Sequence, residues 1–371
     1  MKVVIFCHSL VSDWNHGNAH FLRGICAELQ DRGHQVDVYE PRGGWSRQNL
    51  VATAGTASEA AFRAQFPTLA STEYDLASLD LDAALEGADL VLVHEWSGPE
   101  LVARIGRHHA AGGAYRLLFH DTHHRAVTAP EDIDRFRLEH YDGVLAFGEV
   151  IRRLYLERGW TERAWTWHEA ADTRVFHPHP HSASPEDLVW VGNWGDGERS
   201  EELREFLLGP ARRLRLNGSI YGVRYPWRAR LAVCMSGLCY RGWVANHRVP
   251  ALFARHRFTV HVPRRPYVRA LPGIPTIRVF EALACGIPLI TSPWDDADGL
   301  FTPGSDYLVA ASGAQMVQMM SSITRDRALA ATLAERGRRT ILERHTCAHR
   351  VDELLAILAE LDGRSAERVT A

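Results

Sequence analysis

The sequence predicts an α/β protein built from two doubly wound, Rossmann-like domains, and three observations support this. Short apolar runs of strand length alternate with helical patterns along most of the 371 residues, which is typical of a parallel sheet covered by helices. One proline-rich stretch, HPHPHSASPED at 177–187, interrupts this alternation, which then restarts. The chain is also longer than a single hydrophobic core usually serves.

The first half contains a regular series of strand-like segments and one irregular stretch. A helix is expected over 18–33, because Phe21, Ile25 and Leu29 share one face. The alanine-rich stretch 52–72 interrupts the alternation of strand and helix patterns, and we expect a mobile excursion from the regular fold there. Strands are expected at 3–7, 35–41, 88–96, 115–121, 143–149 and 163–170.

The second half repeats this pattern without repeating the sequence. Residues 314–361 show the pattern of two or three successive helices. We therefore expect an N-terminal domain over 1–178, a C-terminal domain over 179–345, and a terminal helix over 346–371. That last helix is free to pack back on the N-terminal domain and ends in a frayed tail. Strands are expected at 188–194, 219–223, 258–263, 288–293 and 306–310.

Charge and composition exclude several classes of protein. The net charge of -3 argues against a nucleic-acid partner, which usually meets a strongly basic face. Lys2 is the only lysine, so side chains that bind anions must be arginine or histidine. Six scattered cysteines without C-x-x-C spacing indicate reduced thiols. No apolar run approaches the ~18 residues of a membrane span. We expect a cytoplasmic protein, and peripheral membrane contact remains open.

A candidate anion site lies at the start of the helix expected after Pro275. Ligands of doubly wound sheets bind where strands end and helices begin. Thr276 is a suitable N-cap before Ile277, and a helix N-terminus attracts diphosphate. Gly273 would let the backbone approach that anion closely. Glu281, about a turn and a half later, can accept hydrogen bonds from two vicinal ribose hydroxyls or pair with Arg278.

Two loops of the second half supply further candidates. Arg264 and Arg265 follow the strand expected at 258–263. The glycine-rich run WVGNWGDGER at 190–199 contains Asn193 and ends with Arg199. It is either a structural turn or a loop that contacts the nucleotide, and the residues alone leave both possibilities open.

The first half carries histidines at expected strand ends. His120 and Asp121 end an apolar strand, and transfer to a hydroxyl needs a general base or a charge-stabilising group. Gly17 lies in a polar loop before the first helix, and His168 ends the last strand of this half. The run HDTHH at 120–124 also suggests a metal-dependent hydrolase as a remote possibility.

The block RVFEALACGIPLITS at 278–292 resembles the nucleotide-binding element of group 1, family 4-like GT-B glycosyltransferases. It is most similar to their spore-maturation-type branch, where R-x-F-E-x-x-A-C-G is typical. The resemblance extends over 240–263 and over 167–180, where Asp172, Phe176 and Pro178 match the family's interdomain crossing. It implies two domains facing a central cleft, with donor phosphates bound by arginines of the second domain.

The resemblance implies a metal-independent glycosyltransferase without a bound cofactor. Such an enzyme would move a sugar from a nucleotide-diphosphate sugar to a hydroxyl group of an acceptor, and the resemblance does not identify the acceptor. Gly273 stands where many retaining members carry the first glutamate of E-x7-E, so the stereochemical outcome remains open. The same residues are also compatible with a nucleotide-sugar epimerase or hydrolase, and with a non-catalytic nucleotide-sugar-binding protein.

Overall fold

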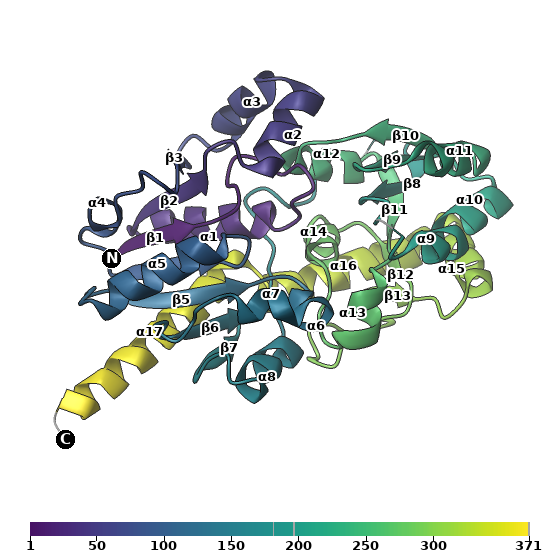
Figure 1. Ribbon diagram of the computed structural model, residues 1–371. Coiled ribbons are helices and arrows are strands. Elements are labelled where there is room, and N and C mark those ends of the chain that lie inside the picture. Colours follow the sequence, from purple (N-terminus) through teal and green to yellow (C-terminus); the bar gives the residue numbers. More distant parts are fainter. Residues whose placement is uncertain (181, 196, 370–371) are drawn as a thin grey trace. The chain divides into compact units, whose positions relative to one another are not determined.

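The computed structural model describes residues 1–180, 182–195 and 197–369, and the chain divides into two compact units (Figure 1). Unit 1 is formed by Met1–Glu169 together with Cys347–Ala371, and unit 2 by Ala170–Thr346. The chain thus enters unit 2 at Ala170, earlier than the expected boundary at 178. The reason is local, because the Ala171 N–H donates to the His345 carbonyl at 2.9 Å, within unit 2.

Unit 1 is built on a seven-stranded, fully parallel sheet in the order β3-β2-β1-β4-β5-β6-β7. The order reverses between β1 and β4, where loops leave in opposite directions and ligands usually bind. The strands are β1 (Lys2–Phe6), β2 (Gln35–Pro41), β3 (Thr72–Tyr74), β4 (Leu90–His94), β5 (Arg116–Asp121), β6 (Gly143–Ala146) and β7 (Ala164–Thr166).

Helices of unit 1 cover this sheet. The helix expected over 18–33 is α1, which buries Phe21, Ile25 and Leu29. The C-terminal helix α17 packs against α1. The stretch 52–72 is largely helical, contrary to the expected mobile excursion, because Phe62 and Leu69 are buried. The helices are α1 (Ala19–Asp31), α2 (Trp45–Ala54), α3 (Ala57–Gln65), α4 (Leu81–Leu85), α5 (Pro99–Ala110), α6 (Arg125–Thr128), α7 (Pro130–Asp134), α8 (Glu149–Glu157) and α17 (Cys347–Val369).

Unit 2 has a six-stranded parallel sheet in the order β10-β9-β8-β11-β12-β13. Here the order reverses between β8 and β11. The strands are β8 (Glu186–Val191), β9 (Gly218–Tyr221), β10 (Cys239–Gly242), β11 (His256–His261), β12 (Leu289–Thr291) and β13 (Leu308–Val309).

The helices of unit 2 pack around a core centred on Phe258 and Ile290. One of them, η1, is a π-helix between two short α-helices, and η2 is a 3-10 turn. They are α9 (Ser200–Leu203), η1 (Arg204–Leu208), α10 (Gly209–Leu214), α11 (Trp227–Met235), η2 (Asn246–Arg248), α12 (Val249–Phe253), α13 (Arg265–Ala270), α14 (Ile277–Ala284), α15 (Gly313–Arg325) and α16 (Arg327–Arg344).

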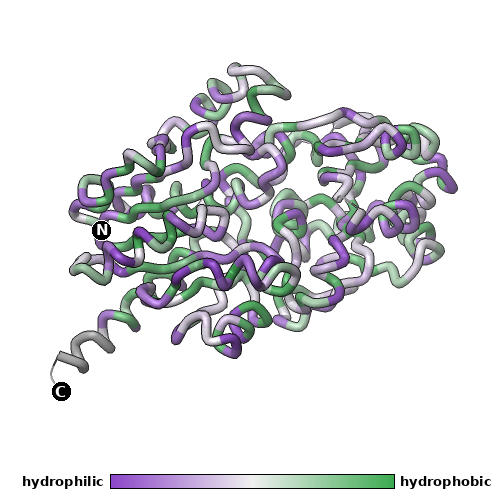
Figure 2. Tube along the Cα trace, in the orientation of Figure 1, coloured by the Kyte–Doolittle hydropathy of each residue, from purple (hydrophilic) through white to green (hydrophobic). Residues whose placement is uncertain are grey.

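The predicted class, two Rossmann-like α/β domains, is confirmed. Hydrophobic residues follow the central strands of both sheets, as Figure 2 shows in green. The strand pattern of the sequence missed β3 and β10, which are edge strands of three and four residues. In the proline-rich stretch, the His177 and His179 rings stack at 4.8 Å, while His181 lies outside the described residues. None of the described helices combines the length and hydropathy of a membrane span.

Candidate active site

Arg199 occupies the carboxyl edge of the unit 2 sheet and anchors two loops there. Its guanidinium donates to the Val262 carbonyl at 3.0 Å and to the Asn193 carbonyl at 2.5 Å. These carbonyls follow β11 and β8, the two strands between which the order reverses. The Asn193 Oδ1 accepts the Val223 N–H at 2.9 Å, which also ties Asn193 to the segment after β9. The predicted candidates Arg199 and Asn193 therefore lie together.

Arg199 carries a buried positive charge. The side chain is buried, and in the described part of the chain no carboxylate bonds to it and its Nε has no partner. Burial, and then the neighbouring charge of Arg264, lower the pKa of Arg199 to about 10, so it remains protonated at neutral pH. A buried cation bonded only to carbonyl oxygens strongly favours a bound anion.

The other two predicted loop arginines lie differently. Arg264 contributes its charge near Arg199 and pairs with Glu198 at 3.1 Å. Arg265 instead donates from Nε to Glu202 at 2.7 Å, and also bonds to the Gly197 carbonyl. Arg265 thereby fastens the start of α13 to α9. The structure brings Arg264, but not Arg265, to Arg199.

Thr276 stands at the N-cap position of α14, but its hydroxyl makes no capping hydrogen bond. The expected cap is wrong because His261 takes this hydroxyl, with Nε2 at 3.0 Å from Thr276 Oγ1. Thr291 Oγ1 donates to the Ser292 carbonyl, so it accepts from Nδ1 of His261, 3.1 Å away. That assigns the Nδ1–H tautomer and makes Nε2 the acceptor. His261 therefore ties β11 and β12 to the start of α14, directly before the buried Ile277.

Burial, and then Arg199, lower the pKa of His261 to about 3. The ring is neutral at physiological pH, so it adds no charge to the arginine site. The sequence analysis missed His261, although its place at the end of a buried strand was a usable signal.

Glu281 lies fully buried in α14 with both oxygens engaged. It accepts a hydrogen bond from Asn246 Nδ2 at 2.7 Å and pairs with the Arg278 guanidinium. The pairing with Arg278, left open by the sequence, is present. The ribose-binding role stays a prediction, and it is compatible with this geometry because a carboxylate offers about four lone pairs.

Gly273 serves a turn next to a carboxylate. Its φ is +87°, a conformation that side chains other than glycine rarely adopt. Its N–H donates to the Asp295 carbonyl at 2.7 Å, and an added Cβ would collide with Oδ1 of Asp298. The close approach at Gly273 is therefore to Asp298.

His120 lies at the carboxyl edge of the unit 1 sheet, in β5 beside the reversal of strand order. The ring is buried between Trp167, at a centroid distance of 4.9 Å, and His94, at 5.3 Å. Its Nε2 has no hydrogen-bond partner among the described residues. Burial lowers the pKa of His120 to about 3, so the imidazole is neutral.

Asp121, the second predicted catalytic residue, makes structural contacts. Its Oδ1 accepts the His123 N–H at 2.9 Å and its Oδ2 accepts the Tyr155 hydroxyl at 2.8 Å. Burial raises the pKa of Asp121 to about 6. Its contacts hold the turn that follows β5, which fixes the position of His120.

Further titratable groups lie at this edge. Glu95 is fully buried and pairs with Arg125 at 2.6 Å, while burial and then Asp121 raise the pKa of Glu95 to about 8. His16 also has a buried Nε2 without a partner among the described residues, and its ring lies 6.3 Å from that of His94. The four imidazoles of His8, His16, His94 and His120 thus form a continuous row.

Two predicted residues of unit 1 stay outside this row. Gly17 lies in the turn before α1, next to His16. His168 follows β7 and is half-buried. Gly17 offers only its backbone to a ligand, and any chemical role of His168 stays a prediction.

The described residues contain no group of three or more His, Cys, Asp or Glu side chains arranged to hold a metal ion. The HDTHH run supplies no such set, because Asp121 is bound to Tyr155 and Nδ1 of His124 bonds to Thr128. All six cysteines are free thiols.

Comparisons with known proteins agree with this fold. Residues 199–356 match the family model described as glycosyl transferase-like. No curated protein matches the sequence.

Three solved structures illustrate the structural similarity. A sucrose-phosphate synthase from Thermosynechococcus elongatus shares 14% identity at a TM-score of 0.64, covering 98% of this chain and 100% of that one. HepE from Anabaena, in complex with UDP and glucose, shares 14% at a TM-score of 0.68, over 97% and 100%. An alpha-glucosyltransferase in complex with UDP and a 13-mer DNA shares 12% at 0.70, over 97% and 100%.

These matches cover the two sheets and the domain that contains Arg199 and Glu281. Residues 199–356 thus form a glycosyl transferase-like domain, and the two sheets have the fold of GT-B glycosyltransferases.

Proposed function

We propose that the protein transfers a glycosyl group from a UDP-sugar to a hydroxyl of an acceptor, without a bound metal or cofactor. The observation that carries this proposal is Arg199, a buried arginine whose guanidinium bonds to two carbonyls and to no described carboxylate. It lies where the strand order of unit 2 reverses, the usual ligand position in such sheets. UDP is present in two of the similar structures, which favours uridine as the base.

The diphosphate would bind to Arg199, Arg264 and the backbone at the start of α14. A guanidinium donates in a fixed fork that suits phosphate oxygens. The helix N-terminus adds a partial positive charge, and no acidic residue occupies the first turn of α14. Both features stabilise the negative charge that develops on the leaving UDP.

The ribose would bind to Glu281. Asn246 and Arg278 orient its carboxylate, which leaves lone pairs for two vicinal hydroxyls. This arrangement agrees with the resemblance of 278–292 to the spore-maturation-type branch, and membership of that branch forms part of the proposal.

His120 is the favoured base. As the acceptor oxygen bonds to the anomeric carbon, its proton would pass to Nε2 of His120. The bond from that carbon to the phosphate oxygen breaks, and UDP leaves with the electron pair. The open, buried Nε2 of His120 supplies the geometry that a general base needs. Gly273, at the place of the first glutamate of E-x7-E, leaves retention or inversion undecided.

Calorimetric titration of the full chain with UDP, GDP and ADP tests the donor site. We expect UDP to bind most tightly, and UDP-glucose to be turned over faster when an acceptor is present. Activity should persist in EDTA. Binding of none of the three nucleotides would overturn the proposal. Rapid hydrolysis of UDP-sugars that no acceptor stimulates would favour a hydrolase instead.

A further inference from the structure

A cavity of about 640 Å³ lies in unit 1, outside the row of imidazoles described above. Its size falls within the range of roughly 300–1,000 Å³ that is usual for small-molecule sites. It is bounded by α2, α3, the segment leading into β3, and the loops after β1 and β2. The stretch 52–72, which the sequence left without a function, forms much of its wall.

The two walls of this cavity differ in chemistry. Phe62, Phe66 and Leu69 form the apolar part of the lining, with the two phenyl rings 5.3 Å apart and the Arg23 guanidinium over one face of each ring. The polar part, called the polar wall below, contains Arg47 and Glu73 together with the Ser71 hydroxyl. A ligand that fits between them needs one apolar face and a rim of hydrogen-bonding groups.

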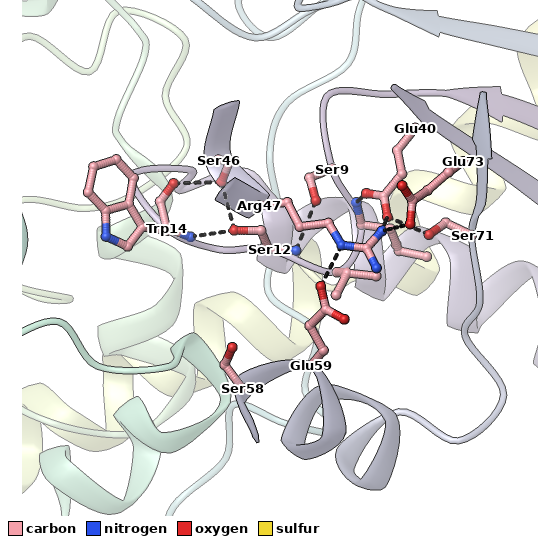
Figure 3. Close-up of polar contacts among 12 residues, drawn as sticks. Ser9, Ser12, Trp14, Glu40, Ser46, Arg47, Ser58, Glu59, Ser71 and Glu73 are labelled. Atoms are coloured by element: carbon pink, nitrogen blue, oxygen red, sulfur yellow. Dashed lines mark hydrogen bonds and ion pairs between the residues drawn. The ribbon is translucent and has the colours of Figure 1, made fainter. Parts of the chain in front are cut away.

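Arg47 is fixed at the centre of the polar wall. It bonds to Glu59 at 2.6 Å, to Glu73 at 2.7 Å and to Glu40 at 3.1 Å, as Figure 3 shows. Ser71 donates to the buried Glu40 at 2.6 Å. These contacts hold the polar groups in place before any ligand arrives, which lowers the cost of ordering them.

The charges around the cavity do not favour an anion. Three carboxylates surround Arg47, and Arg42 pairs with Asp75 at 3.2 Å in solvent. Arg63 also lines the cavity. The three lining arginines and the four carboxylates that pair with Arg42 and Arg47 sum to a formal charge of -1, with Glu73 as the carboxylate of the lining itself. At Arg199, by contrast, no described carboxylate bonds to the guanidinium.

Hydroxyl groups match this polar wall better than a phosphate does. Each hydroxyl can donate to a carboxylate and accept from a guanidinium, and Glu73 in the lining has lone pairs for further donors. The C–H face of a sugar ring would pack on the phenylalanines. We propose that this cavity binds an uncharged saccharide unit. That this unit belongs to the acceptor rests on the proposed transferase function, whereas saccharide binding itself does not.

The cavity is also connected to the loop that carries His16. The Leu10 N–H donates to Glu40 at 2.9 Å, and Ser12 and Ser46 share a hydrogen bond of 2.8 Å (Figure 3). Ser46 further donates to the Trp14 carbonyl at 2.7 Å. Glu40 therefore holds both the loop after β1 and two residues of the polar wall, Ser71 and Arg47.

A cavity-filling substitution tests the proposal. Ala70 lines the cavity and is exposed, so Ala70→Trp fills the space without removing a polar group. Ala64→Trp is the matched control, because Ala64 is an exposed alanine of α3 outside the lining. Glu73→Gln serves as a second variant, which keeps the size of the side chain should Ala70→Trp fail to fold.

Saturation-transfer NMR on the full chain would use maltotriose, cellotriose and chitotriose as neutral probes, with inorganic phosphate as the anion. We expect one trisaccharide to bind, at least tenfold more weakly to Ala70→Trp, several-fold more weakly to Glu73→Gln, and equally to Ala64→Trp. No binding by any trisaccharide, unchanged binding by Ala70→Trp, or displacement of the saccharide by phosphate would overturn the proposal.

UDP binding, measured on the same preparations, separates this inference from the donor site. We expect equal UDP affinity in all three variants and the parent chain. Saccharide binding without UDP binding would refute the transferase function and support the saccharide site in the cavity. UDP binding without saccharide binding would refute the cavity alone.

Discussion

At the carboxyl edge of unit 2, the buried Arg199 donates to two backbone carbonyls and no described carboxylate neutralises it. At the same edge of unit 1, the buried groups are imidazoles with lowered pKa values and the carboxylates Glu95 and Asp121 with raised ones. The first edge holds a buried cation that no described carboxylate bonds, and the second has titratable groups whose pKa shifts favour their neutral forms. The difference suits a donor diphosphate in unit 2 and proton transfer in unit 1.

Replacement of His120 should have the largest effect. His120→Gln removes the open Nε2, and we expect kcat to fall by roughly 10²–10⁴-fold, while the affinity for UDP stays unchanged. Steady-state kinetics with UDP-glucose and calorimetry with UDP check both expectations. A fall in UDP affinity with unchanged kcat would reverse the division of roles between the units.

Asp121→Asn provides the matched control for His120. It keeps the shape of a group that holds Tyr155 and the turn after β5. We expect mainly a loss of stability of about 1–3 kcal/mol, since a buried hydrogen-bonded carboxylate is replaced. A larger loss of kcat in Asp121→Asn than in His120→Gln would make Asp121 the base.

Arg199→Gln should weaken UDP binding by about 10–100-fold, because hydrogen bonds to charged groups contribute about 1.5–3 kcal/mol. Arg265→Gln is the control, since Arg265 bonds to Glu202 and lies apart from Arg199. We expect less than a twofold change in that variant. Calorimetry measures the UDP affinity of both variants. Equal losses of affinity would contradict a specific role of Arg199 in binding the diphosphate.

Lowering the pH should destabilise unit 2 through His261. Its folded-state pKa of about 3 lies below the ordinary value of 6.5, so the folded state binds fewer protons than the unfolded state between these values. The free energy of unfolding is therefore complete above pH 6.5 and falls as the pH drops towards 3. At pH 5 the loss is about 2 kcal/mol.

Urea unfolding at pH 7 and pH 5 measures this loss. His261→Gln should show a smaller difference between the two pH values than the parent chain, even though it lacks two hydrogen bonds of His261. An identical difference in the variant would mean that His261 does not contribute to the pH dependence of stability. His120 in unit 1 has a similarly lowered pKa, so part of the acid sensitivity should remain.

Most strands and the helix that carries Glu281 could be predicted from the sequence. Buried parallel strands give apolar runs, and the helix after Pro275 has a recognisable start. The short edge strands β3 and β10 leave little signal. The partners of Thr276 and Arg265 could not be predicted from the sequence either. His261 and Glu202 are distant from them along the chain and approach them only in the folded protein. The helices within 52–72 were not predicted for a similar reason. Phe62 is buried by contacts with distant parts of the chain, which the local hydrophobic pattern around it does not show.

Glu281→Gln tests the ribose role against the structural pair with Arg278. We expect UDP affinity to fall about tenfold, and 2′-deoxy-UDP to bind the parent chain with a similar loss. If Glu281 holds that hydroxyl, the variant should not discriminate between UDP and 2′-deoxy-UDP, because the two changes remove one interaction. Additive losses in calorimetry would contradict the ribose-binding role of Glu281.

Gly273→Ala tests whether this glycine serves the anion or the turn. The added Cβ would strain a φ of +87° and collide with Asp298, so we expect a loss of about 1–3 kcal/mol in the free energy of unfolding. Gly299→Ala is the matched control, with a φ of +65° and nothing within 4 Å of its Cβ. It should lose only about 1 kcal/mol. Urea unfolding gives both values. If instead Gly273→Ala retains its stability but loses affinity for UDP, Gly273 belongs to the arginine edge of unit 2 rather than to the turn beside Asp298.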